Sequence, residues 1–335
     1  MQKRFGFFAV IVLLISVLGA CAPKTVYIVN EGGIFGTTYR FVYQHPDDQH
    51  KELNELLWRF NSSLSTFDSN SYISRLNRNE AGLPPDTFFL KMFAMAQEVT
   101  EKSSGAFDIT VAPLVNAWGF GFKNRETITE QLIDSLRQYV GMDQLRIEDG
   151  CLIKKQAGVM LDGSAIAKGY GVDVAAEYLE SLGVKNYLVE IGGEMRSLGL
   201  NAKGSSWRVG IDKPDFDQFN GTRELQMIIN LSGASLATSG NYRNYYMEDG
   251  KRYAHIIDPR SGYPVNHSLL SASIIAPTCM EADAYATACM VLGLDSGKLL
   301  VESLPGIEAC FIYHGEEEYQ VYCSPGFPLD EESGN

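Results

Sequence analysis

The feature that most constrains this chain is the segment at residues 158–183, which predicts the end of a strand leading into a helix. The apolar run at residues 158–161 predicts the strand, Ser164 is a predicted N-cap, and apolar side chains at helical spacing continue to Gly183. Lys168 then lies in the first helical turn, where unpaired N–H groups and an ammonium group together suit a phosphate. Because the Walker pattern is absent, a lysine on an exposed helix face is the alternative.

The N-terminus has the pattern of a bacterial lipoprotein signal. Lys3 and Arg4 precede an apolar run at residues 5–17, and small residues lead to Cys21. This pattern predicts a signal peptide over residues 1–20, with Cys21 as the acylated mature N-terminus. The alternative, a membrane-spanning anchor, needs about 20 apolar residues, which is more than this run provides. We therefore expect a lipidated tether at residues 21–27 and a chain anchored outside the cytoplasm, on the periplasmic side of a bacterial membrane.

The charge balance excludes one class of partner. The chain has 28 basic and 41 acidic residues, and removal of residues 1–20 takes away Lys3 and Arg4, which leaves 26 against 41 and a net charge of −15. Nucleic-acid phosphates need a basic surface, so we expect no nucleic-acid partner. No linker divides the chain, which predicts a single domain over residues 28–330 and an acidic tail at 331–335.

Five cysteines remain besides Cys21, and an odd number leaves at least one of them unpaired. Cys310 and Cys323 flank a predicted hairpin that would place them opposite each other, either as a disulfide or as two buried thiols. The cysteines and histidines have no spacing typical of a zinc site.

Strands and helices alternate irregularly, which predicts an α+β fold with mixed sheets and packed helices. Apolar spacing predicts helices at residues 48–60, 87–102 and 129–140. Strands are expected at residues 26–29, 37–43, 187–191, 207–211, 225–231, 235–238 and 269–275, with a hairpin at 151–161 that turns at 156–158. The helix after Thr278 has the clearest limits, because Thr278 and Glu281 form a capping box and Gly293 ends the apolar pattern.

The capped helix carries Asp283 and Thr287 four residues apart, so both side chains lie on one face. A carboxylate and a hydroxyl together make a hard-oxygen site, which favours Mg²⁺ completed by phosphate and water. The alternative is structural, with Asp283 complementing the helix dipole and Thr287 packing.

His255 follows a predicted short strand and precedes a turn that Pro259 and Gly262 enforce. A histidine at such a position could act as a general base, whereas a structural histidine is the common alternative. The Gly-x-Ser-x-Gly pattern is absent, which argues against a serine nucleophile. Another segment, residues 104–113, is predicted as a buried strand or turn before an aromatic, glycine-rich loop at 118–122, whose rings could wall a flat ligand or pack in the core.

In their order along the chain, these segments resemble the FAD:protein FMN transferases, the ApbE-like flavin transferase family. The resemblance covers almost the whole mature chain and rests on nine short motifs. They are Gly36-Thr-Thr-Tyr39, Leu64-Ser-Thr-Phe67 with residues 71–77, Gly105-Ala-Phe-Asp108, Trp118-Gly-Phe-Gly121, residues 162–173, Ile191-Gly-Gly-Glu194, Thr238-Ser-Gly240, His255-Ile-Ile-Asp-Pro259 and Ala282-Asp-Ala-Tyr-Ala-Thr287.

The resemblance implies roles for individual residues. The carbonyl of Ala165 and the side chains of Asp283 and Thr287 would hold Mg²⁺, and Lys168 and Asp283 would act in catalysis. We add His255 as the base. The implied FAD contacts are Phe35, Phe67, Ala106, Phe107, Asp108, Asp162, Lys168 and Ile256. Many relatives carry methionine in place of Phe35 and tyrosine in place of Phe67, so we expect altered flavin contacts with binding retained.

The implied reaction attaches FMN through its phosphate to a threonine or serine of a partner protein and releases AMP. The expected acceptor is a membrane redox-complex subunit with a short Thr/Ser flavinylation motif. Three alternatives remain at this point. The site could hydrolyse FAD to FMN and AMP, the chain could be a lipid-anchored FAD-binding protein without chemistry, or it could be a structural lipoprotein whose acidic surface docks a partner.

Overall fold

The structure, a computed structural model, describes residues 26–214, 224–241, 245–248, 251–315 and 318–330. The predicted signal peptide, Cys21, most of the tether and the acidic tail lie outside these ranges. Among the described helices, none combines the length and the hydropathy that a bilayer crossing requires. The expectations about lipidation and location therefore stay predictions.

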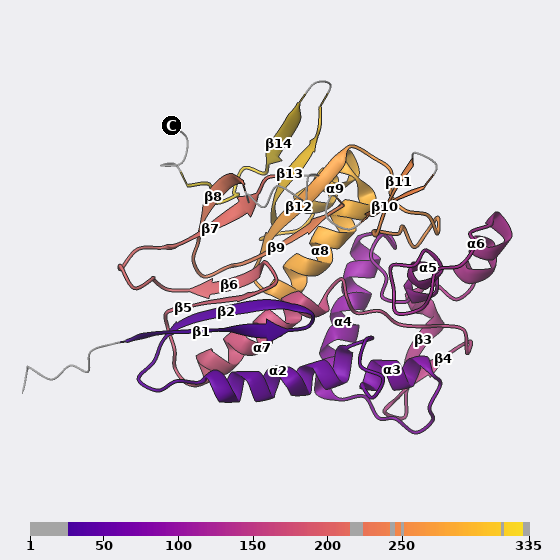
Figure 1. Cartoon of the computed structure of the whole chain (residues 1–335), viewed down its shortest axis with the longest axis horizontal. Coiled ribbons are helices and arrows are strands. Elements are labelled where there is room, and N and C mark those ends of the chain that lie inside the picture. Colours follow the sequence, from indigo (N-terminus) through magenta and orange to yellow (C-terminus); the bar gives the residue numbers. More distant parts are fainter. Residues whose placement is uncertain (1–25, 215–223, 242–244, 249–250, 316–317, 331–335) are drawn as a thin grey trace, which may run out of the picture.

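An eight-stranded antiparallel sheet forms the centre of the fold, in the order β1-β2-β5-β6-β9-β12-β13-β14 (Figure 1). Its strands are β1 (Tyr27–Ile34), β2 (Thr37–Gln44), β5 (Tyr187–Ile191), β6 (Glu194–Leu198), β9 (Ser235–Gly240), β12 (Leu269–Ala276), β13 (Glu308–His314) and β14 (Tyr319–Cys323). Three hairpins lie outside this sheet: β3 (Leu145–Glu148) with β4 (Cys151–Lys154), β7 (Trp207–Asp212) with β8 (Leu225–Leu231), and β10 (Tyr245–Glu248) with β11 (Lys251–Ala254).

Both faces of the sheet are covered, because its buried side chains alternate between two cores. On β9, Ala237 belongs to the main core beneath the helices, whereas Leu236 packs with Val209 and Ile229 of the β7–β8 hairpin. Ile274 and Ile275 on β12 divide in the same way. The period of two along a strand thus sends one set of side chains to each layer.

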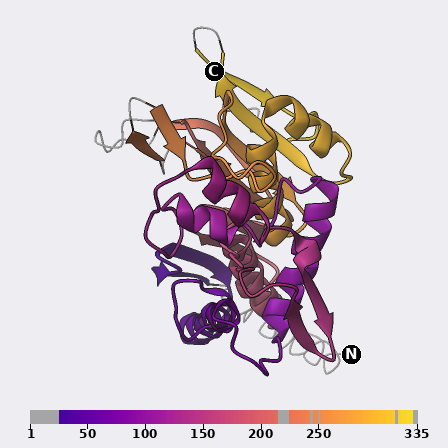
Figure 2. The same ribbon diagram turned by 90° about the vertical axis from the view of Figure 1, so that its right-hand side faces the viewer.

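Helices pack on the face of the sheet opposite the β7–β8 hairpin. Helix α7 (Ala167–Ser181) lies against β5 and β6, and α8 (Cys279–Leu292) lies against β9, β12 and α7. The other described helices are α2 (His50–Leu64), α3 (Tyr72–Asn77), α4 (Thr87–Lys102), α5 (Ala112–Ala117), α6 (Glu130–Arg137) and α9 (Leu294–Glu302), with a 3₁₀ turn at Met142–Gln144. Figures 1 and 2 place α2 and the β13–β14 hairpin at opposite ends of the molecule. The predicted α+β class is confirmed.

The predicted strand at residues 158–161 is wrong. Only an isolated bridge between Val111 and Met160 forms there. The Asn77 side chain takes the place of a neighbouring strand, because its amide accepts from Leu161 N at 2.7 Å and donates to Leu161 O at 2.8 Å. A side chain distant in the sequence therefore satisfies backbone groups that a sheet would otherwise pair.

The predicted hairpin at residues 151–161 is displaced by one strand. Strand β4 pairs with β3 before it, across a turn at Asp149 and Gly150. Both residues have positive φ, 50° and 72°, as a two-residue Asp-Gly hairpin turn requires. The Asp-Gly pair was the stronger turn signal in this stretch of sequence. Residues 104–111 likewise form turns and no strand, and lead into α5.

The expected opposition of Cys310 and Cys323 is confirmed. The two residues are direct partners in the β13–β14 register, and their Sγ atoms lie 2.8 Å apart as free thiols.

Candidate functional site

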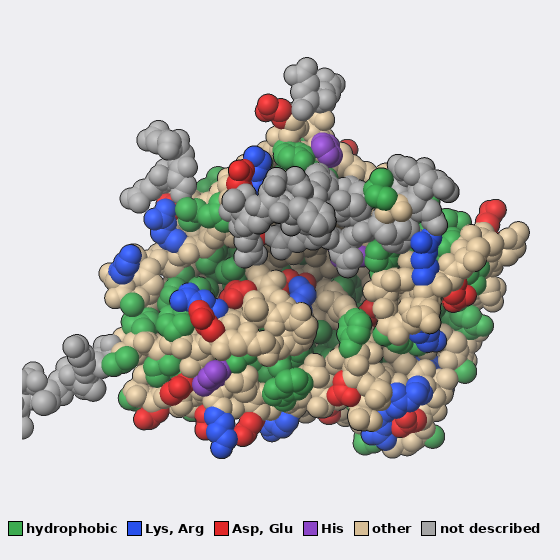
Figure 3. All heavy atoms as spheres, viewed as in Figure 1, with side chains coloured by type: hydrophobic (Ala, Val, Ile, Leu, Met, Phe, Trp, Pro, Cys, Tyr) green, Lys and Arg blue, Asp and Glu red, His purple; other side chains and the backbone are tan. Residues whose placement is uncertain are grey.

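A cleft of about 880 Å³ lies between the central sheet and the β7–β8 hairpin. Strands β2, β5, β6 and β9 line it, together with the segments at residues 106–111 and 255–259. Figure 3 shows this face of the molecule hollowed near its centre, with acidic and basic side chains at the hollow. The cleft collects most of the site residues that the sequence predicted: Phe67, Ala106, Phe107, Asp108, Asp162, Ala165, Lys168, His255, Ile256, Asp283 and Thr287.

Phe35 is the exception, since it does not line the cleft. Its φ of 52° lies in the turn between β1 and β2, and its ring packs 5.4 Å from the ring of Phe60 on α2. The ring also lies so close to α7 that a Cβ on Gly171 would come within 2.6 Å of it. The turn therefore directs Phe35 toward the helices, and the predicted FAD contact is not supported by its position.

Phe67 lies at the cleft and is 74% exposed, which is high for a phenylalanine. It follows α2 in a segment held by Ser65, whose hydroxyl accepts from Phe67 N at 3.3 Å. An exposed aromatic ring beside a cleft is a surface on which a flat ligand can stack.

The start of α7 differs in detail from the prediction. Ile166 is the N-cap and provides no side-chain bond, so Ser164 does not cap the helix. Asp162 accepts instead from Ser164 N at 2.8 Å and holds the turn before the helix. The backbone amide of Gly169 donates to Asp283 Oδ2 at 2.9 Å, and within the described chain no backbone N–H donates to the Ala165 carbonyl.

Helix α8 begins as its sequence predicts. The Thr278 hydroxyl accepts from Glu281 N at 3.2 Å, and the helix then presents Asp283 and Thr287 one turn apart to the cleft. Helices α7 and α8 approach so closely that a Cβ on Gly169 would lie 2.2 Å from Cys279 O. This contact brings Asp283 against the first turn of α7, which contains Lys168 and directly follows Ala165 and Ile166.

Lys168 forms an ion pair with Glu194 at the start of β6. Burial raises the pKa of Glu194 to about 7, and the Lys168 ammonium opposes that change only in part. Burial also acts to lower the pKa of Lys168, but the carboxylates of Glu194 and Asp283 outweigh it and the pKa is raised. Burial raises the pKa of Asp283 as well, against the pull of Lys168 and the Gly169 amide. Like charges thus share a poorly solvated space around one ammonium group.

His255 follows β11 and lies at the cleft, where its ring meets Phe120 edge-on at 6.3 Å between centroids. The loop after it is closed by its own backbone, since Val265 N donates to Ile256 O at 3.0 Å. Asp258 and Arg260 form an ion pair at 2.9 Å within the same turn. His255 is therefore carried at the edge of a constrained loop.

Residues 106–108 form a buried turn that also lines the cleft. Asp108 accepts from Thr110 N at 2.7 Å and from the Thr110 hydroxyl at 2.6 Å. Burial raises the pKa of Asp108, and the Thr110 bonds oppose it. The structure thus brings this segment to the site although it is far in sequence from α7 and α8.

Glu194, Arg40 and Asp212 also line the cleft, although no role for them was predicted from the sequence. A signal for Glu194 existed: an acidic residue directly after Gly192 and Gly193 occupies a buried position of a strand. Ser239 also approaches the site, with its hydroxyl 3.2 Å from the Thr287 hydroxyl.

The residues present fit a hard cation. Among the described residues no group of three His, Cys, Asp or Glu side chains could hold a metal ion. Three residues that line the cleft offer one carboxylate, one hydroxyl and one backbone carbonyl without a partner in the described chain, from Asp283, Thr287 and Ala165. Mg²⁺ commonly takes a few protein oxygens of this kind and completes its octahedron with water and phosphate.

Comparison with known proteins assigns the chain to a family of transferases. The chain is a transferase, since its relatives are named as such. It belongs to the ApbE family, whose profile matches residues 35–311.

Two relatives are each named FAD:protein FMN transferase. One, from Vibrio cholerae, is 38% identical over 320 residues, which is 92% of this chain and 94% of that protein. Another, from Haemophilus influenzae, is 39% identical over 302 residues, 85% and 86% of the two chains.

Solved structures agree with this assignment. The flavin transferase ApbE from Vibrio cholerae superposes with a TM-score of 0.81 at 37% identity, over 91% of this chain and 99% of that one. The apo form of the Pseudomonas stutzeri flavinyl transferase ApbE gives a TM-score of 0.80 at 33% identity, over 91% and 96%. The resemblance found in the sequence is thereby confirmed.

Proposed function

We propose that this chain is a Mg²⁺-dependent FAD:protein FMN transferase that attaches FMN through its phosphate to a threonine or serine of an acceptor protein and releases AMP. The observation that carries the proposal is the convergence of Lys168, Asp283, Thr287 and the Ala165 carbonyl at one cleft. Membership of a family with relatives named FAD:protein FMN transferase supports the choice of substrate.

The proposed reaction is a phosphoryl transfer. The acceptor hydroxyl oxygen attacks the phosphorus on the FMN side of the FAD pyrophosphate, and the bond from that phosphorus to the bridging oxygen breaks. AMP leaves with the bridging oxygen. Negative charge on the phosphate oxygens grows during this step, and the Lys168 ammonium stabilises it. Mg²⁺, when bound by Asp283, Thr287 and the Ala165 carbonyl, would neutralise charge on the same oxygens.

The acceptor hydroxyl loses its proton during attack, and we assign His255 as the base. Its place at the cleft, on a loop separate from α7 and α8, supports this role. Replacement by alanine should lower transfer by about 100- to 10,000-fold, the usual contribution of a general base. If His255→Ala retains near-wild-type transfer while Asp283→Ala abolishes it, the assignment of the base is wrong.

The proposed flavin contacts are the cleft residues of the sequence prediction without Phe35, which packs against α2. Phe67 offers a ring for stacking, and the turn at residues 106–108 with Ile256 provides the buried wall. Asp162 borders the same space.

We further propose a location and a partner. The signal peptide pattern and Cys21 support a lipid anchor on the periplasmic side of a bacterial membrane. An acceptor among membrane redox-complex subunits, with a Thr/Ser flavinylation motif, would meet the enzyme there. The single domain over residues 28–330 would carry the whole activity.

The test combines the chain lacking residues 1–21 with FAD, Mg²⁺ and a candidate acceptor domain, and follows AMP release and the mass of the acceptor. A gain equal to FMN that is lost with EDTA and in Asp283→Ala supports the transferase. AMP without a gain in acceptor mass supports FAD hydrolysis, and FAD binding without AMP supports a carrier.

A further inference from the structure

The side chain of Glu194 is only half satisfied by the protein. It is 2% exposed and lines the cleft, and one carboxylate oxygen pairs with the Lys168 ammonium. The other oxygen, Oε2, is buried and has no hydrogen-bond partner among the described residues. A buried carboxylate normally has all its acceptor sites filled, because an unfilled one retains the cost of leaving water.

A glutamate on the same hairpin shows the ordinary arrangement. Glu190, on β5, accepts a hydrogen bond from Gly193 N at 2.8 Å and so holds the turn before β6. Glu194 does not hold the backbone of another residue in this way, since the backbone amide that acts on its carboxylate is its own. Folding alone therefore does not account for a buried carboxylate at this position, and a donor from outside the chain does.

The chemistry of the surroundings restricts that donor. Lys168 already neutralises part of the charge, so a second cation is not needed to balance Glu194 alone. A phosphate oxygen carries negative charge and would be repelled by the carboxylate. A neutral hydroxyl can donate to Oε2, and FAD has sugar hydroxyls on both sides of its pyrophosphate, on the ribityl chain and on the ribose.

We propose that Glu194 is a positioning residue for the substrate, which rests on the proposed function: one oxygen fixes the Lys168 ammonium and Oε2 accepts a hydrogen bond from a sugar hydroxyl next to the FAD pyrophosphate. Lys168 and Glu194 then bind adjoining groups of FAD: the ammonium binds the phosphate, and the carboxylate accepts a hydrogen bond from the neighbouring hydroxyl. The pair sets the position of the phosphorus along the cleft.

The experiment measures FAD binding by flavin fluorescence in the purified chain, with Mg²⁺ and without acceptor. Glu194→Met removes both acceptor oxygens at similar volume, and Glu194→Gln retains one. We expect Kd for FAD to rise about 10- to 100-fold in Glu194→Met and less in Glu194→Gln, as for loss of a hydrogen bond to a charged group. The thermal midpoint of Glu194→Met should fall, because the buried Lys168 ammonium loses a partner, so the proposal is decided by which half of FAD loses affinity.

Competition experiments identify the hydroxyl. FMN carries only the ribityl chain, and ADP carries only the ribose. The half-molecule whose affinity falls about 10-fold or more in Glu194→Met, while the other is unchanged, contains the donor. Glu177→Gln is the matched control, since Glu177 is on α7, like Lys168, but pairs with Lys91 of α4 at 2.8 Å, away from the cleft. Its Kd for FAD should equal that of the wild type.

Two results would overturn the proposal. Unchanged FAD, FMN and ADP affinities together with a raised Mg²⁺ requirement would make Glu194 a metal ligand. Equal losses of affinity for FMN and ADP in Glu194→Met would make it a structural residue, because a distorted site does not select one half of the substrate. Failure of the proposed function is distinguishable, because the binding contrast between variants needs no transfer to an acceptor.

Discussion

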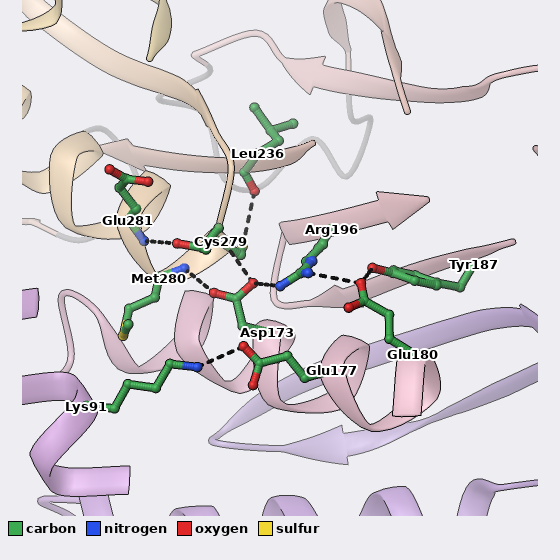
Figure 4. Close-up of polar contacts among 11 residues, drawn as sticks. Lys91, Asp173, Glu177, Glu180, Tyr187, Arg196, Leu236, Cys279, Met280 and Glu281 are labelled. Atoms are coloured by element: carbon green, nitrogen blue, oxygen red, sulfur yellow. Dashed lines mark hydrogen bonds and ion pairs between the residues drawn. The ribbon is translucent and has the colours of Figure 1, made fainter. Parts of the chain in front are cut away.

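Two buried charge clusters lie about one and a half turns apart along α7, and they differ in how fully they are satisfied. In one cluster, Asp173 accepts from Cys279 N at 3.0 Å and from Met280 N at 2.8 Å, and it pairs with Arg196 at 2.9 Å. Figure 4 shows Asp173 pointing toward the first turn of α8 and toward Arg196. The second terminal nitrogen of Arg196, Nη2, pairs with Glu180. Both oxygens of Asp173 have partners from the protein.

The other cluster contains the same kinds of groups but leaves positions open. Lys168 on α7 faces Glu194 on β6, and Asp283 on α8 accepts one backbone amide. One Glu194 oxygen and the Ala165 carbonyl have no partner among the described residues. Burial of charge alone therefore does not identify a functional site. The closed cluster joins α7, α8 and β6, and the open cluster is available to a ligand.

The same substitution in both clusters gives the largest expected contrast. Asp283→Asn keeps an oxygen for the Gly169 amide but loses the charge, so transfer should fall on the order of 1,000-fold, comparable to loss of one key electrostatic group. Urea unfolding should change little. Initial rates of AMP release with a fixed acceptor check the first part. Asp283→Asn with wild-type rates would show that the open cluster is not catalytic.

Asp173→Asn should act on stability. The amide group cannot accept both α8 N–H bonds and the Arg196 bond, so the free energy of unfolding should fall by about 3 kcal/mol, near the usual 3–5 kcal/mol for a broken buried pair. Urea titration measures it, and Glu177→Gln serves as the exposed control. A loss equal to that of Asp283→Asn would remove the distinction between the clusters.

Glu194 in the open cluster should make stability depend on pH. Burial raises the pKa of Glu194 from 4.5 to about 7, so the folded chain binds a proton that the unfolded chain has released between these values. Stability from this group is fully present below pH 4.5 and is lost as pH rises through about 7. At about 1.4 kcal/mol per pKa unit the loss is at most about 3.5 kcal/mol.

Urea titrations at several pH values check this, with Glu194→Gln as the comparison. The glutamine has no proton to release, so its stability curve should be flatter between pH 4.5 and 7. Parallel curves for the two proteins would contradict the assignment of the shift to Glu194.

The smallest expected effect concerns Thr287. Thr287→Val keeps the shape but removes the hydroxyl that lies 3.2 Å from Ser239, and the Mg²⁺ concentration for half-maximal transfer should rise about 10-fold. Thr287→Ser should restore it. Activity titrations with Mg²⁺ measure both, and a Thr287→Val protein with unchanged Mg²⁺ dependence would exclude the hydroxyl as a ligand.

Much of the fold followed from local patterns, whereas most of the site residues followed from the family resemblance. The capping box at Thr278 defines α8, and the apolar spacing before Gly183 defines α7, because such interactions lie within a few residues. The errors occur where distant groups compete. Ser164 does not cap α7, since its hydroxyl donates to Asp162, and residues 158–161 form no strand, since Asn77 pairs with Leu161.

Patterns along the sequence predict the α+β class, the helix that carries Asp283 and Thr287, the lysine at the start of α7 and the family. Which of these groups meet depends on how distant segments pack. It turned Phe35 toward α2 and left Phe67 exposed at the cleft. It also brought Glu194 onto Lys168. The physical reason is that a helix or strand is encoded by its neighbours, whereas the satisfaction of a buried carboxylate depends on partners that packing brings from distant parts of the chain.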